Sequence, residues 1–414
     1  MVSLATLTAE FGKKYKRTNA ELVFDPRKRV EFIPSGNIIF DLVSGGGFPR
    51  GRISEVFGLE HSGKTALTLL MAASQQKLGN IGVFIDHELT WHAPYAEKTY
   101  NLIQDNETFT VFQPSCIEEG DLIVDELDKL DKLDYIIFDS VDAMRPKLAL
   151  QRSQMKDSAI PGSHAKAMSD MVHKMLGFAH RKHCAAIFIN QMRAAIITKK
   201  YEQTAKSAAG YAPNESFITT GGHTLRFYAS LRTKTEYADK IVDELGMDVV
   251  MGAQEKYGTR KGSQIKIINV KSKVGTPYLK GISNFVFPTP DNPGGWQRGL
   301  DLLELLKRRG RVRQQSSRFV YNGLKPEFAE WTSTGKVVSE DKFCNSPELM
   351  EDAEQLLKSL IGKHDVSKLL DMAVQGEDFT VDEIDESGYK PSTDPNFDDF
   401  TVPGSNDPVS EISI

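Results

Sequence analysis

The sequence predicts an α/β protein built on a mostly parallel, twisted sheet with helices on both faces. Short apolar runs alternate with longer helical segments through residues 31–190. Each apolar run ends in a polar residue or a glycine, and one run leads directly into a glycine-rich loop. Strands that alternate with helices in this way run parallel and are covered on both faces.

The expected elements follow from these patterns in chain order. Strands are expected at residues 53–57, 82–86, 135–139 and 185–190, with helices at 65–78, 118–132 and 163–183. Two further strands, at 224–233 and 263–270, follow without long helices and are expected to extend the sheet. Residues 194–220 and 236–260 are polar and long for connections, which indicates function or mobility.

Composition divides the chain into four predicted parts. Leu4, Leu7 and Phe11 recur at helical spacing, so residues 1–30 are expected to hold a short amphipathic helix. Residues 31–292 are expected to form the core. The other parts are a small α+β C-terminal domain at 293–376, with helices at 300–307, 350–360 and 366–373, and an acidic tail at 377–414 that is expected to be disordered.

The bulk composition excludes several classes of protein. Hydrophobic residues make up 40% of the chain and charged residues 26%, as in an ordinary globular protein. No apolar run approaches the roughly 18 residues that a membrane span needs, and the N-terminus lacks a secretory signal pattern. Cys116, Cys184 and Cys344 fit neither a disulfide framework nor a metal cluster. We therefore expect a protein of a reducing cytoplasm with no membrane partner.

The net charge of −5 hides an asymmetry between the body and the tail. Residues 377–414 hold 11 acidic residues and one basic residue, which leaves 50 basic against 45 acidic residues in the rest of the chain. A mildly basic body with an acidic tail suits a protein that contacts nucleic acid and regulates that contact. A tail that only aids solubility is equally compatible with these charges.

A phosphate-binding loop is the strongest local motif. Residues 58–65 match the pattern G-x-x-x-x-G-K-[ST] and lie between an expected strand and an expected helix, which is the context that the motif requires. Backbone N–H groups of such a loop face phosphate oxygens, and the helix N-terminus adds positive potential. We expect Lys64 to contact the β and γ phosphates of ATP and Thr65 to ligate Mg²⁺. The predicted nucleotide contacts of this loop are Gly58, Glu60, His61, Ser62, Gly63, Lys64, Thr65 and Ala66.

Two further expected strands deliver carboxylates to the same edge of the sheet. Asp139 ends an apolar run, where Mg²⁺ bound to a phosphate loop needs an acidic partner. Glu88 follows the strand at 82–86 and is the best-placed residue to orient an attacking water. From the local sequence alone, Glu88 is equally compatible with a solvated loop acid.

Several blocks of the sequence, taken together, resemble the ATPase core of bacterial RecA recombinases. They lie in the family's order and cover about residues 31–330, so the likeness is more specific than any single motif. The blocks include Gly45-Gly-Gly-Phe-Pro-Arg-Gly-Arg-Ile53, Phe84-Ile-Asp-His-Glu88, Phe188-Ile-Asn-Gln-Met-Arg193, Thr219-Thr-Gly-Gly222, Arg226-Phe-Tyr-Ala-Ser230 and Lys271-Ser-Lys273. The resemblance implies a P-loop NTPase core of the RecA type. It also implies an ATP-dependent recombinase with DNA-dependent ATPase activity. Such a protein forms helical filaments on single-stranded DNA and exchanges strands with homologous duplex DNA.

The resemblance also implies roles for residues around the nucleotide. Glu88 matches the family's catalytic glutamate, and Gln191 matches the glutamine that senses the γ phosphate. Tyr95 matches the aromatic residue that stacks on adenine, although His92 replaces the family's acidic residue near it. Lys271 and Lys273 match a lysine pair that reaches ATP on the neighbouring subunit, where positive charge would compensate the transferring phosphoryl group.

DNA contacts are implied on two loops. The second loop aligns with residues 193–222, and its cations and aromatic side chains suit single-stranded DNA. The first loop is expected at about residues 155–164. His173 stands where the family has a basic contact. The matched DNA-binding residues are Lys166, Arg193, Ile196, Lys199, Lys200, Gly221 and Gly222.

Partners and rival functions complete the expectations. The N-terminal helix resembles an element that packs on the next protomer, and single-strand-binding or mediator proteins are possible further partners.

Two alternative functions stay open. The first is a ring-forming helicase or motor on the same fold, which closed translocating hexamers would reveal; the chain shows no separate N-terminal helicase domain. An ATP-switched DNA-binding filament mediator without strand exchange is the other, against which the intact Lys64, Thr65, Glu88 and Asp139 argue.

Overall fold

The structure is a computed structural model, and it describes residues 30–154, 163–194, 217–242, 260–315, 318–321, 323 and 338–363. All of these residues belong to one compact unit, Met1–Val374. Several expected features lie outside the described residues: the N-terminal helix, most of the first DNA loop, the helix at 366–373 and the acidic tail. The same holds for Ile196, Lys199 and Lys200 of the second DNA loop.

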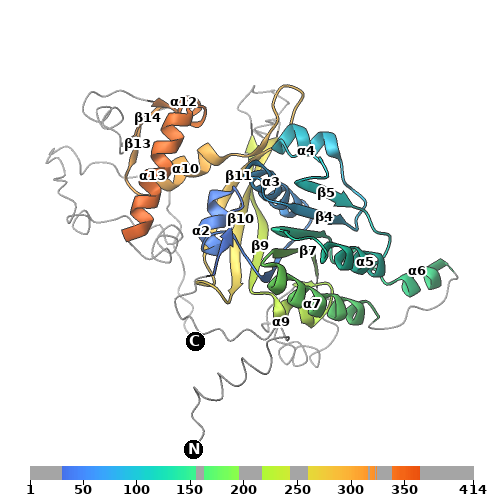
Figure 1. The fold of residues 1–414 in the computed structure, drawn as a ribbon. Helices are drawn as coiled ribbons and strands as arrows, with labels where there is room; N and C mark the ends of the chain where they lie inside the picture. The colour runs from blue at the N-terminus through green and yellow to red at the C-terminus, as the bar shows by residue number, and fades with distance from the viewer. Residues whose placement is uncertain are drawn as a thin grey trace, which may run out of the picture. The chain divides into compact units, whose positions relative to one another are not determined.

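The core of the described chain is a 10-stranded sheet with a parallel centre and an antiparallel side (Figure 1). The strand order is β12-β11-β10-β9-β3-β7-β6-β4-β5, with β8 paired to β7. Every pair from β9 to β5 in this order is parallel, whereas β9 to β12 pair antiparallel. The strands are β3 (Arg52–Gly58), β4 (Gly82–Asp86), β5 (Phe109–Phe112), β6 (Tyr135–Asp139), β7 (Ala185–Ala194), β8 (Phe217–Thr219), β9 (Leu231–Val242), β10 (Arg260–Ser272), β11 (Lys280–Val286) and β12 (Gly295–Trp296).

Helices cover both faces of the sheet, because the central strands carry apolar side chains on both sides. Along β6, Tyr135 and Ile137 pack into one core, while Ile136 and Phe138 pack into the other. The first core includes side chains of α2 (Ile38–Ser44), α3 (Lys64–Lys77) and α4 (Ala93–Tyr100). The second includes side chains of α5 (Ile117–Leu127), α7 (Ser163–Lys182) and α9 (His223–Tyr228). Two smaller features, the β1–β2 pair (Phe32–Ile33, Phe48–Pro49) and α6 (Lys147–Gln154), complete this part of the chain.

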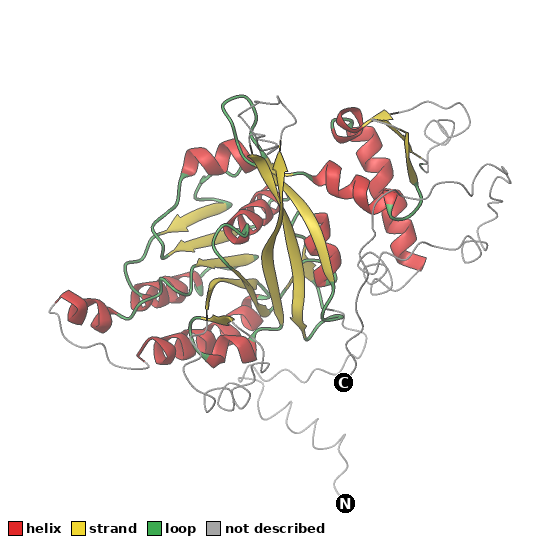
Figure 2. Ribbon diagram, turned by 180° about the vertical axis from the view of Figure 1, so that it is seen from behind, coloured by secondary structure: helices red, strands yellow, loops and turns green. Residues whose placement is uncertain are grey.

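The C-terminal segment of the described chain forms a third, smaller core (Figure 2). Its elements are α10 (Arg298–Lys307), β13 (Val312–Gln315), β14 (Arg318–Tyr321), β15 (Val338–Ser339), α12 (Glu340–Cys344) and α13 (Pro347–Lys363). Ile38 and Leu42 of α2 pack against this core as well as against the first one. Buried Asp301 of α10 also accepts a 2.8 Å hydrogen bond from the backbone N–H of Asn284. The segment is therefore tied to the sheet by both apolar and polar contacts.

The fold class is confirmed, and most central elements match the expectation closely. Strands β4 and β6 occupy the expected residues, and α3, α7 and β7 begin within a residue of theirs. The expected helix at 118–132 ends earlier, at Leu127. The elements that went unrecognised in the sequence include α2, α4, β5 and β11.

The expected strand at 224–233 is wrong in its first half. Residues His223–Tyr228 form helix α9, and β9 begins only at Leu231. Leu225 is buried in the second core, so tertiary packing overrides the strand propensity of this aromatic-rich run. The expected irregular segment at 236–260 is also shorter, because β9 continues to Val242. Along this outer part of β9 side chains such as Tyr237 are exposed, which removes the apolar pattern of a buried strand.

Candidate nucleotide site

The phosphate loop joins the end of β3 to the start of α3. Gly58 ends the strand, where a side-chain Cβ would lie 2.2 Å from the backbone oxygen of Thr235. Gly63 precedes α3 with a φ of +79°, which favours glycine, and no side chain caps the helix. The first N–H groups of α3 are therefore available to an anion, which is the arrangement that binds phosphate.

Lys64 and Thr65 begin α3 and project toward the end of β6. The Nζ of Lys64 donates to the backbone oxygen of Leu59 at 2.7 Å. Burial lowers the pKa of Lys64, and the charges of Asp139 and Glu88 oppose that shift. The Oγ1 of Thr65 donates to the Oδ2 of Asp139 at 2.7 Å. The two residues that the sequence assigned to Mg²⁺ are thus in direct contact.

Asp139 is buried at the C-terminal end of β6. Burial, and after it the nearby charge of Glu88, raise the pKa of its carboxyl to about 7 against the opposing effect of the Thr65 hydrogen bond. A hydroxyl and a carboxylate oxygen are the hard ligands that Mg²⁺ prefers. A cation beside Asp139 would also compensate the charge that burial disfavours. The residues present therefore fit Mg²⁺ in company with phosphate oxygens.

Glu88 lies at the same edge of the sheet, just after β4. Its backbone N–H donates to the oxygen of Asp139 at 3.2 Å. Its Oε1 accepts from the Oγ of Ser140 at 2.5 Å and from the Nε2 of Gln191 at 3.3 Å. The structure thus brings Lys64, Thr65, Glu88, Asp139 and Gln191 to one edge of the sheet.

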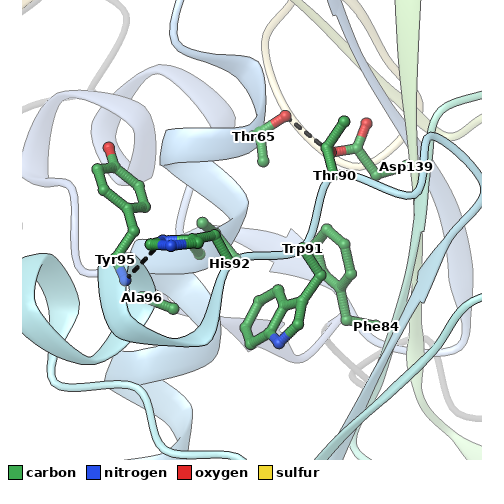
Figure 3. A pocket seen from close by; sticks show the side chains of 9 residues that line it. Thr65, Phe84, Thr90, Trp91, His92, Tyr95, Ala96 and Asp139 are labelled. Atoms are coloured by element: carbon green, nitrogen blue, oxygen red, sulfur yellow. Dashed lines mark hydrogen bonds between the residues drawn. The ribbon is translucent and has the colours of Figure 1, made fainter.

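A pocket extends from this edge toward α4 (Figure 3). Its lining residues are Thr65, Leu69, Phe84, Thr90, Trp91, His92, Tyr95, Ala96 and Asp139. The Nδ1 of His92 accepts from the backbone N–H of Tyr95 at 3.2 Å, which caps α4. This bond requires an unprotonated Nδ1, so a neutral His92 carries its proton on Nε2. Thr65 and Asp139 at one end and Tyr95 at the other give the pocket a polar end and an aromatic end.

Two tryptophans beside the phosphate loop and its pocket were missed by the sequence analysis. Trp91 lines the pocket, and its backbone N–H donates to the Oδ2 of buried Asp86 at 2.8 Å. Trp296 of β12 packs against the phosphate loop, with its ring 3.3 Å from where a Cβ on Gly63 would lie. The position of Trp91, three residues after Glu88, offered a weak signal. Trp296 offered none, because only the pairing of β12 with β11 brings it to the loop.

Lys271 and Lys273 lie at the opposite edge of the sheet. Lys271 pairs with Arg232 near the start of β9. The backbone N–H of Lys273 donates to Ser230, whose own N–H donates to Ile53 at the start of β3, whereas the phosphate loop follows the end of β3. The Nζ of Lys271 donates to the backbone oxygens of Arg226 and Phe227, and that of Lys273 donates to the oxygen of Phe227. Burial and the charge of Lys273 lower the pKa of Lys271 to about 8. Within one chain, the pair holds the C-terminal end of α9.

The described residues matched to DNA contacts gather where β7 ends and α7 begins. Lys166 is exposed on the first turn of α7. Arg193 is exposed near the end of β7 and forms an ion pair with Asp142. Gly221 and Gly222 have φ values of +83° and +78°, and a Cβ on Gly221 would lie 2.6 Å from a methyl of Val141. Glycine is therefore required at position 221 by both conformation and space.

Comparisons with known proteins agree with this architecture. The model of the RecA N-terminal domain matches residues 2–289. The protein RecA of Corynebacterium urealyticum is 30% identical over 406 residues, which cover 98% of this chain and 95% of that protein. The protein RecA of Bacteroides thetaiotaomicron is 31% identical over 340 residues, which cover 82% of this chain and 90% of that protein. The chain belongs to the RecA family.

Family membership agrees with the resemblance seen in the sequence and with the α/β sheet. The protein RecA of Corynebacterium efficiens, at 31% identity over 402 residues, covers 97% of this chain as well. Among the described residues, no helix combines the length and the apolar character needed to cross a membrane. The same part of the chain contains no cluster of three or more His, Cys, Asp or Glu side chains able to hold a metal.

Proposed function

We propose that this RecA-family protein is an ATP-dependent DNA recombinase. It assembles as a helical filament on single-stranded DNA, pairs that strand with a homologous duplex and exchanges strands, and DNA stimulates its hydrolysis of ATP. ATP with Mg²⁺ is the cofactor, and Gly58 through Ala66 together with Tyr95 and Asp139 form its pocket. Base pairing tests homology, so the protein needs little sequence readout of its own.

The position of the two lysines carries the proposal. Lys271 and Lys273 lie at the edge of the sheet where β3 begins, and Lys64 lies where β3 ends. Lys64 and the lysine pair of one chain therefore cannot contact the same triphosphate. In two chains stacked head to tail, Lys64 of one chain and the lysine pair of the other can. Head-to-tail contacts that do not close produce helical filaments. Nucleotide held between subunits would then couple hydrolysis to the stability of the filament.

The chain's own residues divide the chemistry among them. Lys64 and the N–H groups that begin α3 bind the phosphates, while Thr65 and Asp139 orient the cation. Mg²⁺, when bound, supplies charge neutralisation on the β and γ phosphates. Glu88 orients the attacking water, and Gln191, which contacts Glu88, registers the γ phosphate. Lys271 and Lys273 of the adjacent subunit compensate charge on the transferring group.

DNA contact is assigned to the surface where β7 ends. Lys166 and Arg193 supply positive charge there, and Gly221 and Gly222 allow backbone N–H groups to approach phosphate. Lys199 and Lys200 add cations, and Ile196 adds an apolar side chain able to separate bases. Binding of this kind is dominated by phosphate contacts and weakens as salt rises.

Strand exchange between a circular single strand and a homologous linear duplex tests the function directly. We expect joint molecules with ATP and Mg²⁺, none with a heterologous duplex, and none with Lys64→Ala. Closed hexamers that unwind duplex DNA would instead indicate a helicase. Nucleotide-dependent DNA binding without joint molecules would indicate a mediator protein.

A mixing experiment tests the shared nucleotide site. Lys64→Ala and the double variant Lys271→Ala/Lys273→Ala are each expected to lack DNA-stimulated ATPase activity. In an equal mixture, about one quarter of head-to-tail interfaces combine an intact phosphate loop with an intact lysine pair. Activity should therefore return to a fraction of the wild-type rate. A mixture as inactive as its two components would contradict a site shared between subunits.

A further inference from the structure

The two ends of segment 195–216 are joined in the described structure. Residues on both sides of the segment pair as a short antiparallel ladder, in which Met192 lies opposite Thr219 and Arg193 lies opposite Ile218. The ladder forms the base of the segment that the sequence assigns to DNA. Any residue that fixes this base therefore fixes where the segment leaves and rejoins the sheet.

Asn190 and Thr220 close the base just below this ladder. The Oγ1 of Thr220 donates to the Oδ1 of Asn190 at 2.6 Å, and the Nδ2 of Asn190 donates to the backbone oxygen of Thr220 at 3.0 Å. Asn190 is fully buried. Two reciprocal hydrogen bonds favour one geometry, because the fully buried amide of Asn190 would lose a partner if either bond broke.

A buried ion pair on the adjacent strand fixes the orientation of Asn190. The Nδ2 of Asn190 also donates to the Oε1 of Glu55 at 2.8 Å, and the Oε2 of Glu55 accepts from the Nε of Arg232 at 2.5 Å. Glu55 and Arg232 are both buried, and the guanidinium of Arg232 lies over the ring of Phe57. Because an ionised Glu55 can only accept, the amide NH₂ of Asn190 must face it, and Oδ1 must face Thr220.

This row of side chains lies beside both nucleotide-related groups. The residue after Asn190 is Gln191, whose side chain donates to Glu88 at the nucleotide edge. At the other end, Arg232 lies opposite Lys271 in the pairing of β9 with β10. The row therefore links the base of segment 195–216 to strand positions next to the two places where this chain would meet a triphosphate.

We propose that Glu55, Asn190 and Thr220 form a latch, in which they act as positioning residues that make the base of segment 195–216 move as one body with Gln191. The latch couples nucleotide at the Glu88 edge to the DNA segment without touching either ligand. This inference rests on the proposed function only in naming DNA as the ligand of the segment.

The variant Thr220→Val tests the latch, because it keeps the shape of the side chain and removes the hydroxyl that donates to Asn190. We expect the affinity for a fluorescent ATP analogue to stay within about twofold. In the wild-type protein, a slowly hydrolysed ATP analogue should tighten binding to a single-stranded oligonucleotide by some factor. We expect that factor to fall at least about tenfold in the variant, because the buried Oδ1 of Asn190 loses its donor. Thr220→Ser should restore that factor. Should Thr220→Val fail to fold, as circular dichroism would show, Thr220→Ala replaces it.

Thr224→Val is the matched control. The Thr224 hydroxyl also donates to a side chain, the Oγ of Ser169 at 3.2 Å, but it lies outside the latch. The Thr224→Val variant should leave unchanged the factor by which the ATP analogue tightens DNA binding. An equal loss in Thr224→Val and Thr220→Val, or no loss in Thr220→Val, would overturn the latch.

Limited trypsin digestion separates failure of the latch from failure of the proposed function. Lys199, Lys200 and Lys206 provide cleavage sites within the segment. The ATP analogue should change the cleavage rate there in the wild-type protein and not in Thr220→Val. That result together with absent DNA binding would sink the recombinase proposal and keep the latch. A wild-type protein in which nucleotide alters neither cleavage nor DNA binding would overturn the latch itself.

Discussion

The two edges of the central sheet differ in how their functional side chains are organised. At the end of β3, Thr65 and the backbone of Glu88 donate hydrogen bonds to Asp139, and the charges of Asp139 and Glu88 act on Lys64. These side chains come together within a single chain. At the start of β3, the side chains of Lys271 and Lys273 donate to backbone oxygens at the C-terminal end of α9. Under the proposed function, the second edge supplies the lysine pair that completes the nucleotide site of a neighbouring subunit.

Glu88→Gln tests the nucleotide edge with the largest expected effect. Glutamine keeps the acceptor oxygen for Ser140 and Gln191 but loses the charge that orients water. We expect kcat for DNA-stimulated ATP hydrolysis to fall by about 10²–10³-fold, as for loss of a general base. Nucleotide affinity, measured with a fluorescent ATP analogue, should change by less than about threefold. A variant with near wild-type turnover would show that Glu88 is only a structural acid.

Gly58→Ala and Gly275→Ala compare how closely the backbone is packed at the nucleotide edge and beside the lysine pair. A Cβ at Gly58 would lie 2.2 Å from the backbone oxygen of Thr235, so β3 and β9 must separate. We expect the free energy of unfolding to fall by about 2–4 kcal/mol, by analogy with overpacked cores. Gly275, in the turn after Lys273, is the control, because a Cβ there meets its nearest atoms at 3.7 Å. Gly275→Ala should cost less than about 0.5 kcal/mol in the same denaturant titration.

Positions that follow from strand order could be predicted from the sequence. Strands β4 and β6 are apolar on both faces and end in carboxylates, so parallel pairing alone places Asp139 and Glu88 beside the phosphate loop. Contacts that depend on long-range pairing could not be predicted. Helix α9 looked like a strand, because neither the burial of Leu225 nor the lysines at its C-terminus can be read from residues 223–228.

The same distinction explains the missed residues of the site and the latch. Trp296 reaches the phosphate loop only through antiparallel pairing at the far side of the sheet. Asn190 was seen only as the neighbour of Gln191, because its partners Glu55 and Thr220 lie 135 and 30 residues away. Buried polar partners carry no periodic signal, so no local pattern predicts them.

The pH dependence of Mg²⁺ binding offers a sharper contrast between the edges. Burial and Glu88 raise the pKa of Asp139 to about 7, and a proton there competes with the cation. At fixed nucleotide, Mg²⁺ affinity should rise up to about tenfold per pH unit below pH 7 and level off above it. Asp139→Asn should remove that dependence, as a Mg²⁺ titration would show. A wild-type affinity flat from pH 6 to 8 would contradict the assignment.

The free protein should respond to the same titration with the opposite sign. Because the pKa of Asp139 is higher in the folded chain than the ordinary value of an aspartate, 3.8, the folded state binds the proton more tightly. This contribution to stability is complete below the unfolded pKa and is lost as pH rises through about 7. Thermal unfolding without Mg²⁺ should therefore show a steeper loss of stability between pH 5 and 8 in the wild-type protein than in Asp139→Asn.

The smallest expected effect concerns the second edge in isolation. If Lys271 and Lys273 serve only a neighbouring subunit, Lys271→Ala/Lys273→Ala should bind a fluorescent ATP analogue within about twofold of wild type under dilute, DNA-free conditions, where subunits are apart. The loss should appear only on adding single-stranded DNA, as a failure of nucleotide to stabilise the assembly in light scattering. Weakened nucleotide binding by the dilute variant would mean that the lysines act within their own chain, and the difference between the two edges would then lose its functional meaning.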